Sequence, residues 1–288
     1  MSQSRPRRSA IYLPASSARA IEKARTLPCD VVILDLEDMV GADGKAAARA
    51  AAVEAVRSGG FGRRELVIRV NGLDTPWGAD DLAAAAAARP HAVLTPKVSR
   101  PEDLMAARTA LGEEPALWAM IETCAAAIRL DILGAASRAA GANVWVIGSH
   151  DLAKDMHCAL TPERAPLLPA LANSVMAARA HKLEILDGIF ADIADVAGLD
   201  AQCRQGAALG FDGKTLIHPT QIVAANQAFT PDAAAMAWAQ AVVAAFEAPE
   251  NTGKGVLEVE GRLVERAHLA DAKRLLELAA AITQAEVA

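Results

Sequence analysis

Two neighbouring stretches decide the fold: Ala116-Leu-Trp-Ala-Met-Ile-Glu122 and, after an alanine-rich segment, Val144-Trp-Val-Ile-Gly-Ser-His-Asp151. Each starts as a short apolar run, which is typical of a strand buried on both faces, while the alanine-rich segment between them is typical of a helix. The order strand, helix, strand indicates a parallel sheet or barrel. Each stretch ends on an acid, and the carboxyl ends of parallel strands meet at the edge where such folds keep their active sites.

The same alternation continues to both sides of these stretches. Strands are predicted at residues 10–13, 31–36, 66–70, 92–95, 117–121, 144–147, 183–186 and 211–214. Helices are predicted at residues 18–26, 45–57, 80–88, 101–111, 123–137, 167–181, 195–209 and 219–228. Eight strand–helix repeats are what a closed TIM (β/α)8 barrel requires. An open doubly wound sheet is the alternative, but the turn after the first strand, Pro14-Ala-Ser-Ser17, lacks the expected glycine-rich pattern.

The barrel is predicted to occupy residues 1–230, and residues 231–288 are predicted to form a C-terminal helical extension. In that tail we expect a helix at 231–246, a loop-like stretch at 250–261 and a last helix at about 265–281. The tail is too short to be expected to have a core of its own. Packing on its own barrel and reaching a neighbouring subunit both remain open.

Composition narrows the class of protein. The 288 residues carry 29 basic and 35 acidic side chains, a net charge of −6, which argues against nucleic acid or an anionic membrane as a partner. The four cysteines form no Cys-x-x-Cys pair and are expected to be reduced thiols. No leader-like or membrane-spanning apolar run is visible. These features predict a cytoplasmic enzyme.

Glu122 and Asp151 are the candidate metal ligands. Mg²⁺ prefers oxygen ligands and often takes only one or two protein carboxylates, and these two acids follow adjacent predicted strands. The alternative is that each caps the helix that follows it. Thr123 and Ser149 are themselves suitable caps, which weakens that alternative.

Arg69 lies inside the apolar run Leu66-Val-Ile-Arg-Val70. A guanidinium in such a run is costly unless it is paired, and its fork suits a carboxylate. It is predicted to pair with Asp35 or Glu37 on the adjacent strand, to bind a substrate carboxylate, or to do both. Asp35 and Glu37 share one face of that strand by period two, and Asp38 lies on the other face or in the loop.

Several other polar residues are weaker candidates. Lys97 and Lys214 end predicted strands and are possible Schiff-base lysines, although a lysine beside carboxylates is expected to be a charged partner. Arg19 and Lys23 follow the first strand and are suited to a phosphate group, with solvated surface charge as the alternative for Lys23. The histidines show no zinc pattern, and His218 is expected to cap or pack near the eighth helix.

The chain resembles the HpcH/HpaI aldolase–citrate lyase family, which includes the citrate lyase beta subunit and malyl-CoA lyase. The matching stretches keep their order along the chain; they are Arg8-Ser-Ala-Ile-Tyr-Leu-Pro14, Val32-Ile-Leu-Asp-Leu-Glu-Asp38 with Lys45, Ile68-Arg-Val-Asn-Gly-Leu-Asp-Thr-Pro-Trp-Gly78, Thr95-Pro-Lys-Val98, Met120-Ile-Glu-Thr123, Gly148-Ser-His-Asp-Leu152 and Gly210-Phe-Asp-Gly-Lys-Thr-Leu-Ile-His-Pro219. The malyl-CoA lyase branch is the most similar.

The resemblance implies a TIM barrel enzyme that reversibly cleaves a 3-hydroxyacyl-CoA into acetyl-CoA or propionyl-CoA and an oxoacid. It implies Mg²⁺ on Glu122 and Asp151, with CoA as part of the substrate, and a homo-oligomer, trimer or hexamer. The candidate catalytic residues are Arg69, Asp38 and Glu265. The candidate substrate-binding residues are Arg69, Arg19, Lys97, Asp35 and Glu37.

Glu265 is the candidate catalytic residue in the C-terminal extension. In similar proteins the tail covers a neighbouring subunit's site and presents an aspartate as acid or base, and the matching motif here is Gly261-Arg-Leu-Val-Glu265. One extra methylene at this position leaves room for a hydrolytic relative, a malyl-CoA thioesterase. A citrate lyase beta-type subunit that acts on a carrier-bound acyl group is the third alternative.

Overall fold

The computed structural model describes residues 5–287, and side-chain burial within residues 5–285. The chain divides into two compact units. One is Arg7–Phe229, and the other contains the chain from Thr230 onward together with residues 5 and 6. The first carries the long alternation of strands and helices, and the second carries the C-terminal extension.

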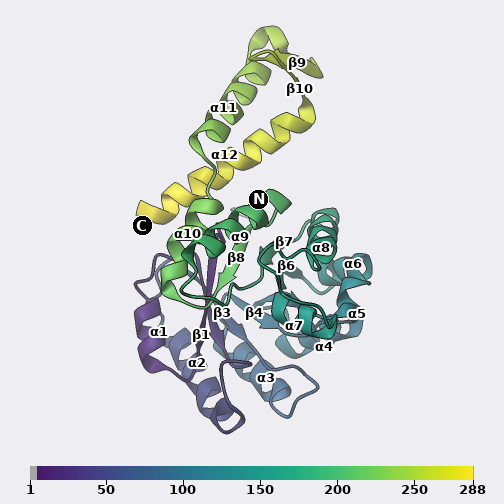
Figure 1. Ribbon diagram of the computed structural model, residues 1–288. Helices are drawn as coiled ribbons and strands as arrows, with labels where there is room; N and C mark the ends of the chain where they lie inside the picture. The colour runs from purple at the N-terminus through teal and green to yellow at the C-terminus, as the bar shows by residue number, and fades with distance from the viewer. Residues whose placement is uncertain (1–4, 288) are drawn as a thin grey trace. The chain divides into compact units, whose positions relative to one another are not determined.

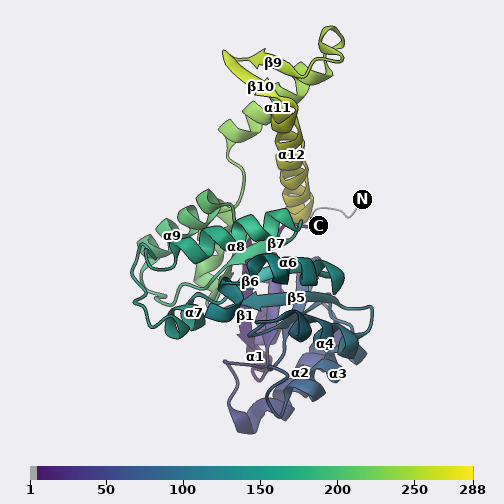
Figure 2. The same cartoon turned by 90° about the vertical axis from the view of Figure 1, so that its right-hand side faces the viewer.

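Unit Arg7–Phe229 is a closed barrel of parallel strands in sequential order, as predicted. Figures 1 and 2 show its strands surrounded by helices. The strands are β1 (Ser9–Pro14), β2 (Val31–Asp35), β3 (Glu65–Arg69), β4 (Ala92–Thr95), β5 (Ala116–Ile121), β6 (Ala142–Ile147), β7 (Glu184–Asp187) and β8 (Gly213–Leu216). The helices are α1 (Ala18–Ala24), α2 (Lys45–Ser58), α3 (Gly78–Ala88), α4 (Pro101–Leu111), α5 (Cys124–Ala127), α6 (Leu130–Ala139), α7 (Ser149–Asp155), α8 (Leu168–Ala180), α9 (Val196–Leu209) and α10 (Ile222–Ala228), with short 3-10 turns at Ala42–Gly44 and Pro219–Gln221.

The strands bury side chains on both faces, which explains their continuous apolar runs. One cluster fills the barrel interior and includes Ile33, Val67, Trp118 and Met120. A larger cluster lies between the strands and the helices. A fully buried aliphatic side chain in either cluster contributes roughly 1.5–3 kcal/mol to stability.

Strand alternation also places the polar residues. Asp35 is two residues after Ile33 and Arg69 is two residues after Val67, so both continue the interior face of their strands. Glu122 likewise follows Met120 by two residues. The barrel interior therefore ends, at its carboxyl edge, in charged side chains from β2, β3 and β5.

Three predicted elements differ from the structure. The helix predicted at 123–137 is two helices, because Arg129 leaves the helical region of backbone space (φ −125°, ψ 21°) between α5 and α6. Asp151 does not lie at a strand end, because the chain turns at Gly148 and begins α7 at Ser149. The eighth strand begins at Gly213, two residues later than predicted, so Lys214 is near its start.

The second unit is more than two helices and a loop. It contains α11 (Ala233–Glu247), a 3-10 turn at Pro249–Asn251, β9 (Val256–Val259), β10 (Arg262–Glu265) and α12 (Arg266–Val287). The prediction of a loop-like stretch through residue 261 was wrong. Residues 256–259 pair with residues 262–265 in an antiparallel hairpin. The two strands are joined by a turn at Glu260-Gly261, where both residues have positive φ.

The prediction that this tail has no core of its own was also wrong. Leu257, Val259 and Val264 on the hairpin pack with Ala239 and Val242 on α11 in a separate apolar cluster, with Ala272 of α12 completing it. The opposite face of the hairpin carries Val256, Glu258, Leu263 and Glu265, all exposed.

None of the helices within residues 5–287 has both the length and the apolar character needed to cross a bilayer.

Candidate active site

Arg69 is the centre of a cluster of charges at the carboxyl edge of the barrel. Its Nε and Nη2 donate to the two carboxylate oxygens of Asp35, each at 2.6 Å. Its Nη1 lies 2.7 Å from Glu37 Oε2 and 3.2 Å from Asp38 Oδ2. Asp35 is fully buried and Arg69 is 5% exposed, so the bidentate pair is well shielded from water. The structure thus forms both ion pairs that the sequence suggested for Arg69, and it adds Asp38.

The loop after β2 is shaped around these carboxylates. Asp35 accepts hydrogen bonds from the backbone N–H groups of Glu37 and Met39, at 2.9 and 3.0 Å. Lys45, buried at the start of α2, donates from Nζ to the Leu36 and Glu37 carbonyl oxygens, at 2.8 and 2.7 Å. These bonds fix Glu37 and Asp38 beside Arg69.

A further amide completes this support. Asn71, two residues after Arg69, accepts from Lys45 Nζ at 2.7 Å and donates to Asp81 at 2.6 Å. The sequence analysis did not assign functions to Lys45 or Asn71. Both residues lie in the stretches that carry the family resemblance, and this could have indicated that they support the site.

Lys97 connects the Arg69 cluster to Glu122. Its backbone is left-handed (φ 53°), and this directs its N–H to Glu122 Oε1 at 2.7 Å while Nζ donates to Glu37 Oε1 at 2.7 Å. Burial disfavours the charged amine, but the hydrogen bond and charge of Glu37 outweigh it and raise the pKa of Lys97 to about 12. Lys97 is therefore a cation and not a neutral Schiff-base nucleophile.

Glu122 is a buried carboxylate with an unused oxygen. It is 1% exposed, and its Oε2 has no hydrogen-bond partner among the described residues. Burial, with the charges of Glu37 and Asp151, raises the pKa of Glu122 to about 8 against the opposing effects of the Lys97 N–H and Arg69. A cation bound at Oε2 would stabilise the ionised carboxylate and offset most of the free-energy cost of burying its charge.

Asp151 lies in the first turn of α7, and its charge acts on Glu122. Neither acid caps a helix: Thr123 caps α5 by accepting from the Ala126 N–H at 3.0 Å, as expected, and Gly148 occupies the N-cap position of α7 without a side-chain bond. The prediction that Ser149 caps this helix was wrong.

Glycine at 148 makes room for Glu122. A Cβ at this position would lie 2.3 Å from Glu122 Oε2.

Residues 5–285 contain no group of three or more His, Cys, Asp or Glu side chains placed to hold a metal ion. Two carboxylates with an open oxygen suit Mg²⁺, which keeps waters and substrate as its other ligands, and they do not suit zinc, which takes three or four protein ligands.

Tyr12 lies against Arg69 inside the barrel. The guanidinium carbon is 4.7 Å from the centre of the Tyr12 ring, a cation–π contact. The side chain is 3% exposed and its hydroxyl has no hydrogen-bond partner among the described residues. Burial raises the pKa of the hydroxyl further than Arg69 lowers it, so Tyr12 is a neutral phenol. The sequence analysis assigned no function to Tyr12, which it quoted only within the stretch Arg8–Pro14.

Lys214 does not belong to the site. It is fully buried and donates from Nζ to Asp187 Oδ2 at 3.0 Å, to Gln202 Oε1 at 2.7 Å on α9, and to the Gly188 carbonyl oxygen. Asp187 also accepts from Arg164 Nη1 at 2.6 Å. Asp187 follows inward-facing Leu186, so this cluster lies between the barrel wall and the helices, and the Schiff-base hypothesis for Lys214 was wrong.

The remaining predicted residues occupy separate places. Arg19 is exposed on α1, directly after β1, and its contact with a phosphate stays a prediction. His218 is the N-cap of the 3-10 turn before α10, as expected. Glu265 lies in the second unit, where its backbone N–H donates to His268 Nδ1 at 2.9 Å, and its catalytic role also stays a prediction.

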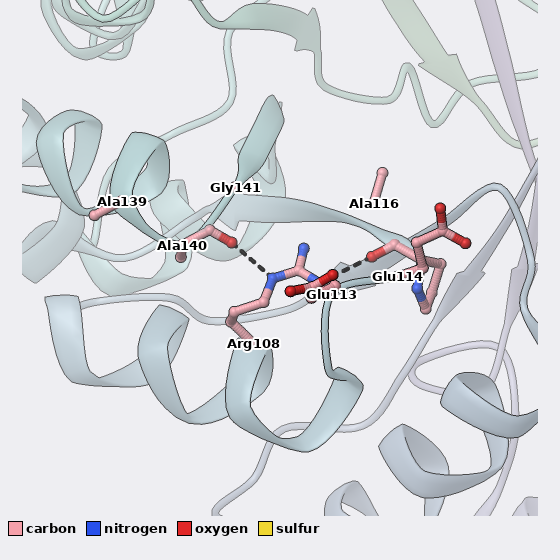
Figure 3. Close-up of a pocket in the computed structure, with 8 residues that line it drawn as sticks. Arg108, Glu113, Glu114, Ala116, Ala139, Ala140 and Gly141 are labelled. Atoms are coloured by element: carbon pink, nitrogen blue, oxygen red, sulfur yellow. Dashed lines mark hydrogen bonds between the residues drawn. The ribbon is translucent and has the colours of Figure 1, made fainter.

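A shallow hollow of about 500 Å³ lies at the amino ends of β5 and β6, the opposite edge from Glu122. Figure 3 shows Arg108 reaching across it. Arg108 donates to the carbonyl oxygens of Ala140 at 2.7 Å, Gly112 at 2.8 Å and Pro115 at 3.1 Å. The guanidinium of Arg108 is therefore used to join backbone segments. Among the described residues that line it, the hollow has no cluster of charged groups like the one around Arg69 and Glu122.

The chain is similar to known proteins in sequence. The model of the family described as HpcH/HpaI aldolase/citrate lyase matches residues 8–219. The chain is similar to a (3S)-malyl-CoA thioesterase of Cereibacter sphaeroides, with 43% identity over 280 residues that cover 97% of each protein. It is also similar to the L-malyl-CoA/beta-methylmalyl-CoA lyase of that species, with 34% identity in an alignment of 306 positions, gaps included, that covers 97% of this chain and 96% of the relative.

Solved structures are similar as well. The protein CitE of Mycobacterium tuberculosis, in complex with magnesium, acetoacetate and coenzyme A, is 29% identical with a TM-score of 0.76, over 94% of this chain and 97% of that one. The citrate lyase beta subunit from the same organism, complexed with oxaloacetate and magnesium, is 28% identical with a TM-score of 0.68, over 80% of this chain and 99% of that one.

Proposed function

The chain belongs to the HpcH/HpaI aldolase/citrate lyase family, and from this premise we propose that it is a Mg²⁺-dependent enzyme that acts on a malyl-type CoA thioester. The observation that carries the proposal is the contiguous site built from Arg69, Lys97 and Glu122. A guanidinium whose Nη1 is shared between Glu37 and the more exposed Asp38 belongs to the same site as a buried carboxylate with an unused oxygen. Such a pair suits a substrate that has a carboxylate next to a hydroxyl group.

Arg69 is proposed to bind the substrate carboxylate. Its Nε and Nη2 are committed to Asp35, which orients the fork, while Nη1 contacts Glu37 at 2.7 Å and, more weakly, Asp38 at 3.2 Å. The Asp38 side chain is 58% exposed and is the carboxylate of the cluster that can move aside at least cost. An incoming carboxylate would then take its place on Nη1.

Glu122 and Asp151 would hold the metal ion. Magnesium bound there would supply Lewis-acid stabilisation of negative charge on the substrate oxygens. The unpartnered Glu122 Oε2, which Gly148 leaves room for, and the nearby charge of Asp151 both suit this ion. Lys97 orients Glu122 through its N–H and remains a cation that balances Glu37.

Hydrolysis of the thioester is the reaction that we favour, because the similar thioesterases are 42–43% identical to this chain and the similar lyases 34% identical. In this reaction a water oxygen bonds to the thioester carbon, the C–S bond breaks, and the thiolate of CoA takes a proton. Asp38, displaced from Arg69 and exposed to solvent, is the candidate that would orient the water and accept its proton.

Carbon–carbon cleavage is the second candidate, favoured by the similarity to the lyases. Here the substrate hydroxyl loses its proton, the adjacent C–C bond breaks to give an oxoacid, and the electron pair remains on acetyl-CoA as an enolate that is then protonated. The proposed acid is Glu265, on the exposed face of the hairpin with Val256 and Leu263. That apolar and acidic face supports a homo-oligomer, in which a second copy covers the site.

The test is a substrate panel of malyl-CoA, citramalyl-CoA and citryl-CoA, with thioester loss followed in MgCl₂ and in EDTA. We expect consumption of malyl-CoA with Mg²⁺ and none with the chelator. Equal consumption in EDTA would contradict the metal site, and no consumption of any of the three would contradict the substrate class. Activity that appears only with an acylated carrier protein would point to the carrier-dependent alternative.

Substituting Gly148 by alanine (G148A) is expected to weaken Mg²⁺ binding by roughly 10- to 100-fold, since an added Cβ displaces the carboxylate that it touches. Calorimetric titration with MgCl₂ measures the change. Gly41 is the matched control: its φ is −67° and a Cβ there meets no atom within 4 Å, so G41A should bind Mg²⁺ like the wild type. Equal affinity of G148A and wild type would refute the placement of the metal on Glu122.

The raised pKa of Glu122, about 8, predicts pH dependence with a definite sign. In the metal-free protein the folded state favours protonated Glu122, so this group's contribution to stability is full below its unfolded pKa and is lost as pH rises towards 8. Mg²⁺ requires the ionised form. We therefore expect Mg²⁺ affinity to increase between pH 6 and about 8, with protons released on binding. Calorimetry in buffers of different ionisation enthalpy measures the release, and its absence would contradict the prediction.

A further inference from the structure

Tyr12 has a position that the reaction described so far does not use. In the register of β1 with β2, Tyr12 is opposite Ile33, and the Pro14–Asp35 pair follows two residues later, at the carboxyl edge. The ring therefore lies one layer below Asp35, with the Arg69 guanidinium packed on it at 4.7 Å. Anything that Arg69 binds at this edge lies near the Tyr12 side chain.

The hydroxyl of Tyr12 is a buried polar group without a partner among the described residues. Most buried polar groups in proteins are hydrogen-bonded, and leaving one unpaired costs free energy. The charges of Arg69, Asp35 and Glu122 all act on this hydroxyl, which places it within the polar end of the barrel. The nearby carboxylate oxygens of Asp35 are already taken by Arg69 and by backbone N–H groups.

The chemistry of the group defines its partner. A neutral phenol donates one hydrogen bond, and an anionic oxygen is the acceptor that it binds most strongly. The cation on its ring, Arg69, attracts a carboxylate to the same place. We infer that the Tyr12 hydroxyl is kept unpaired in the free protein so that it can donate to an anionic oxygen of the bound acid, which makes Tyr12 a ligand-binding residue. This inference rests on the proposed function, because it assumes that a carboxylate-bearing ligand occupies Arg69.

The substitution Tyr12→Phe tests the hydroxyl and keeps the ring on Arg69. Its first expected effect is on the protein without ligand: the thermal midpoint in EDTA should stay the same or increase, because an unpaired buried polar group is removed. Its second is on binding: in saturating MgCl₂ the dissociation constants of glyoxylate and pyruvate should increase by about 10- to 100-fold, the usual loss for a hydrogen bond to a charged group. Both are measured on the full chain, by calorimetry.

Thr95→Val is the matched control. Thr95 Oγ1 is also buried without a partner in the described residues, but Thr95 follows inward-facing Leu94 and so points away from the barrel interior. This variant should also keep or raise the thermal midpoint, and it should leave both dissociation constants unchanged.

Three results would overturn the inference. A clear decrease in the thermal midpoint of Tyr12→Phe would show that the hydroxyl is already paired. Unchanged dissociation constants would show that it does not reach the ligand. Weaker binding by Tyr12→Leu but not by Tyr12→Phe would assign the effect to the ring. The proposed function fails in a different way, if the wild type binds both acids yet converts no malyl-type CoA ester.

Discussion

Replacing Arg69 by lysine (R69K) is expected to lower kcat/KM for malyl-CoA by roughly 10²- to 10³-fold, a typical effect of losing one charged group aimed at the reacting centre. Lysine retains the charge beside Asp35 but lacks the planar fork that pairs with Asp35 and offers Nη1 to a substrate. Steady-state kinetics measures the loss, and urea unfolding shows whether the variant remains folded.

Arg204 provides the control for this substitution. It forms an exposed ion pair with Asp200 on α9, and such pairs contribute little. R204K should therefore retain wild-type kinetics and stability. A folded R69K protein with wild-type kcat/KM would show that Arg69 is only structural, holding Asp35 and the loop after β2.

The second large effect is expected from Glu122→Gln. Glutamine keeps the shape of the side chain but removes the charge, so Mg²⁺ binding and turnover should both decrease, the latter by roughly 10²-fold or more. Stability in EDTA should change in the opposite direction. Since burial raises the pKa of Glu122 to about 8, the ionised wild-type group is costly at alkaline pH, and E122Q should be the more stable protein above pH 8.

Glu113 supplies the comparison for this variant. It lies exposed at the amino edge of the barrel, beside the hollow at Arg108, and E113Q should change neither Mg²⁺ binding nor turnover. An E122Q protein that binds Mg²⁺ like the wild type would remove Glu122 from the metal site. If E122Q is less stable than the wild type in EDTA above pH 8, the ionised Glu122 of the wild type does not lower stability, and this part of the prediction is wrong.

The fold was predictable because its signal is periodic. Short apolar runs alternate with alanine-rich helices over the first 228 residues, and period two within each run places Arg69 and Asp35 on the interior face. The hairpin in the tail had a signal of the same kind: Leu257-Glu-Val-Glu260 alternates apolar and acidic residues just before Gly261. The hairpin was missed because its first strand has only four residues, and because the glycines on both sides of that strand favoured the prediction of a loop.

The candidate site was predictable in its residues and less so in its geometry. Lys97 follows proline, but its left-handed backbone, which turns its N–H to Glu122, depends on the fold around it. Lys214 was misplaced because a strand boundary wrong by two residues moved it from the start of β8 to the end. The unpaired Tyr12 hydroxyl has no signal in one sequence, since pairing depends on contacts between strands.

The most direct measurement is the identity of the products formed from malyl-CoA by the purified protein with Mg²⁺. Chromatography separates free CoA and malate, which hydrolysis releases in equal amounts, from acetyl-CoA and glyoxylate, which cleavage releases. The proposed function predicts CoA and malate in equal amounts, with formation abolished by EDTA. Acetyl-CoA and glyoxylate in place of these would contradict hydrolysis and assign the site to carbon–carbon cleavage, and product formation that persists in EDTA would contradict the metal site itself.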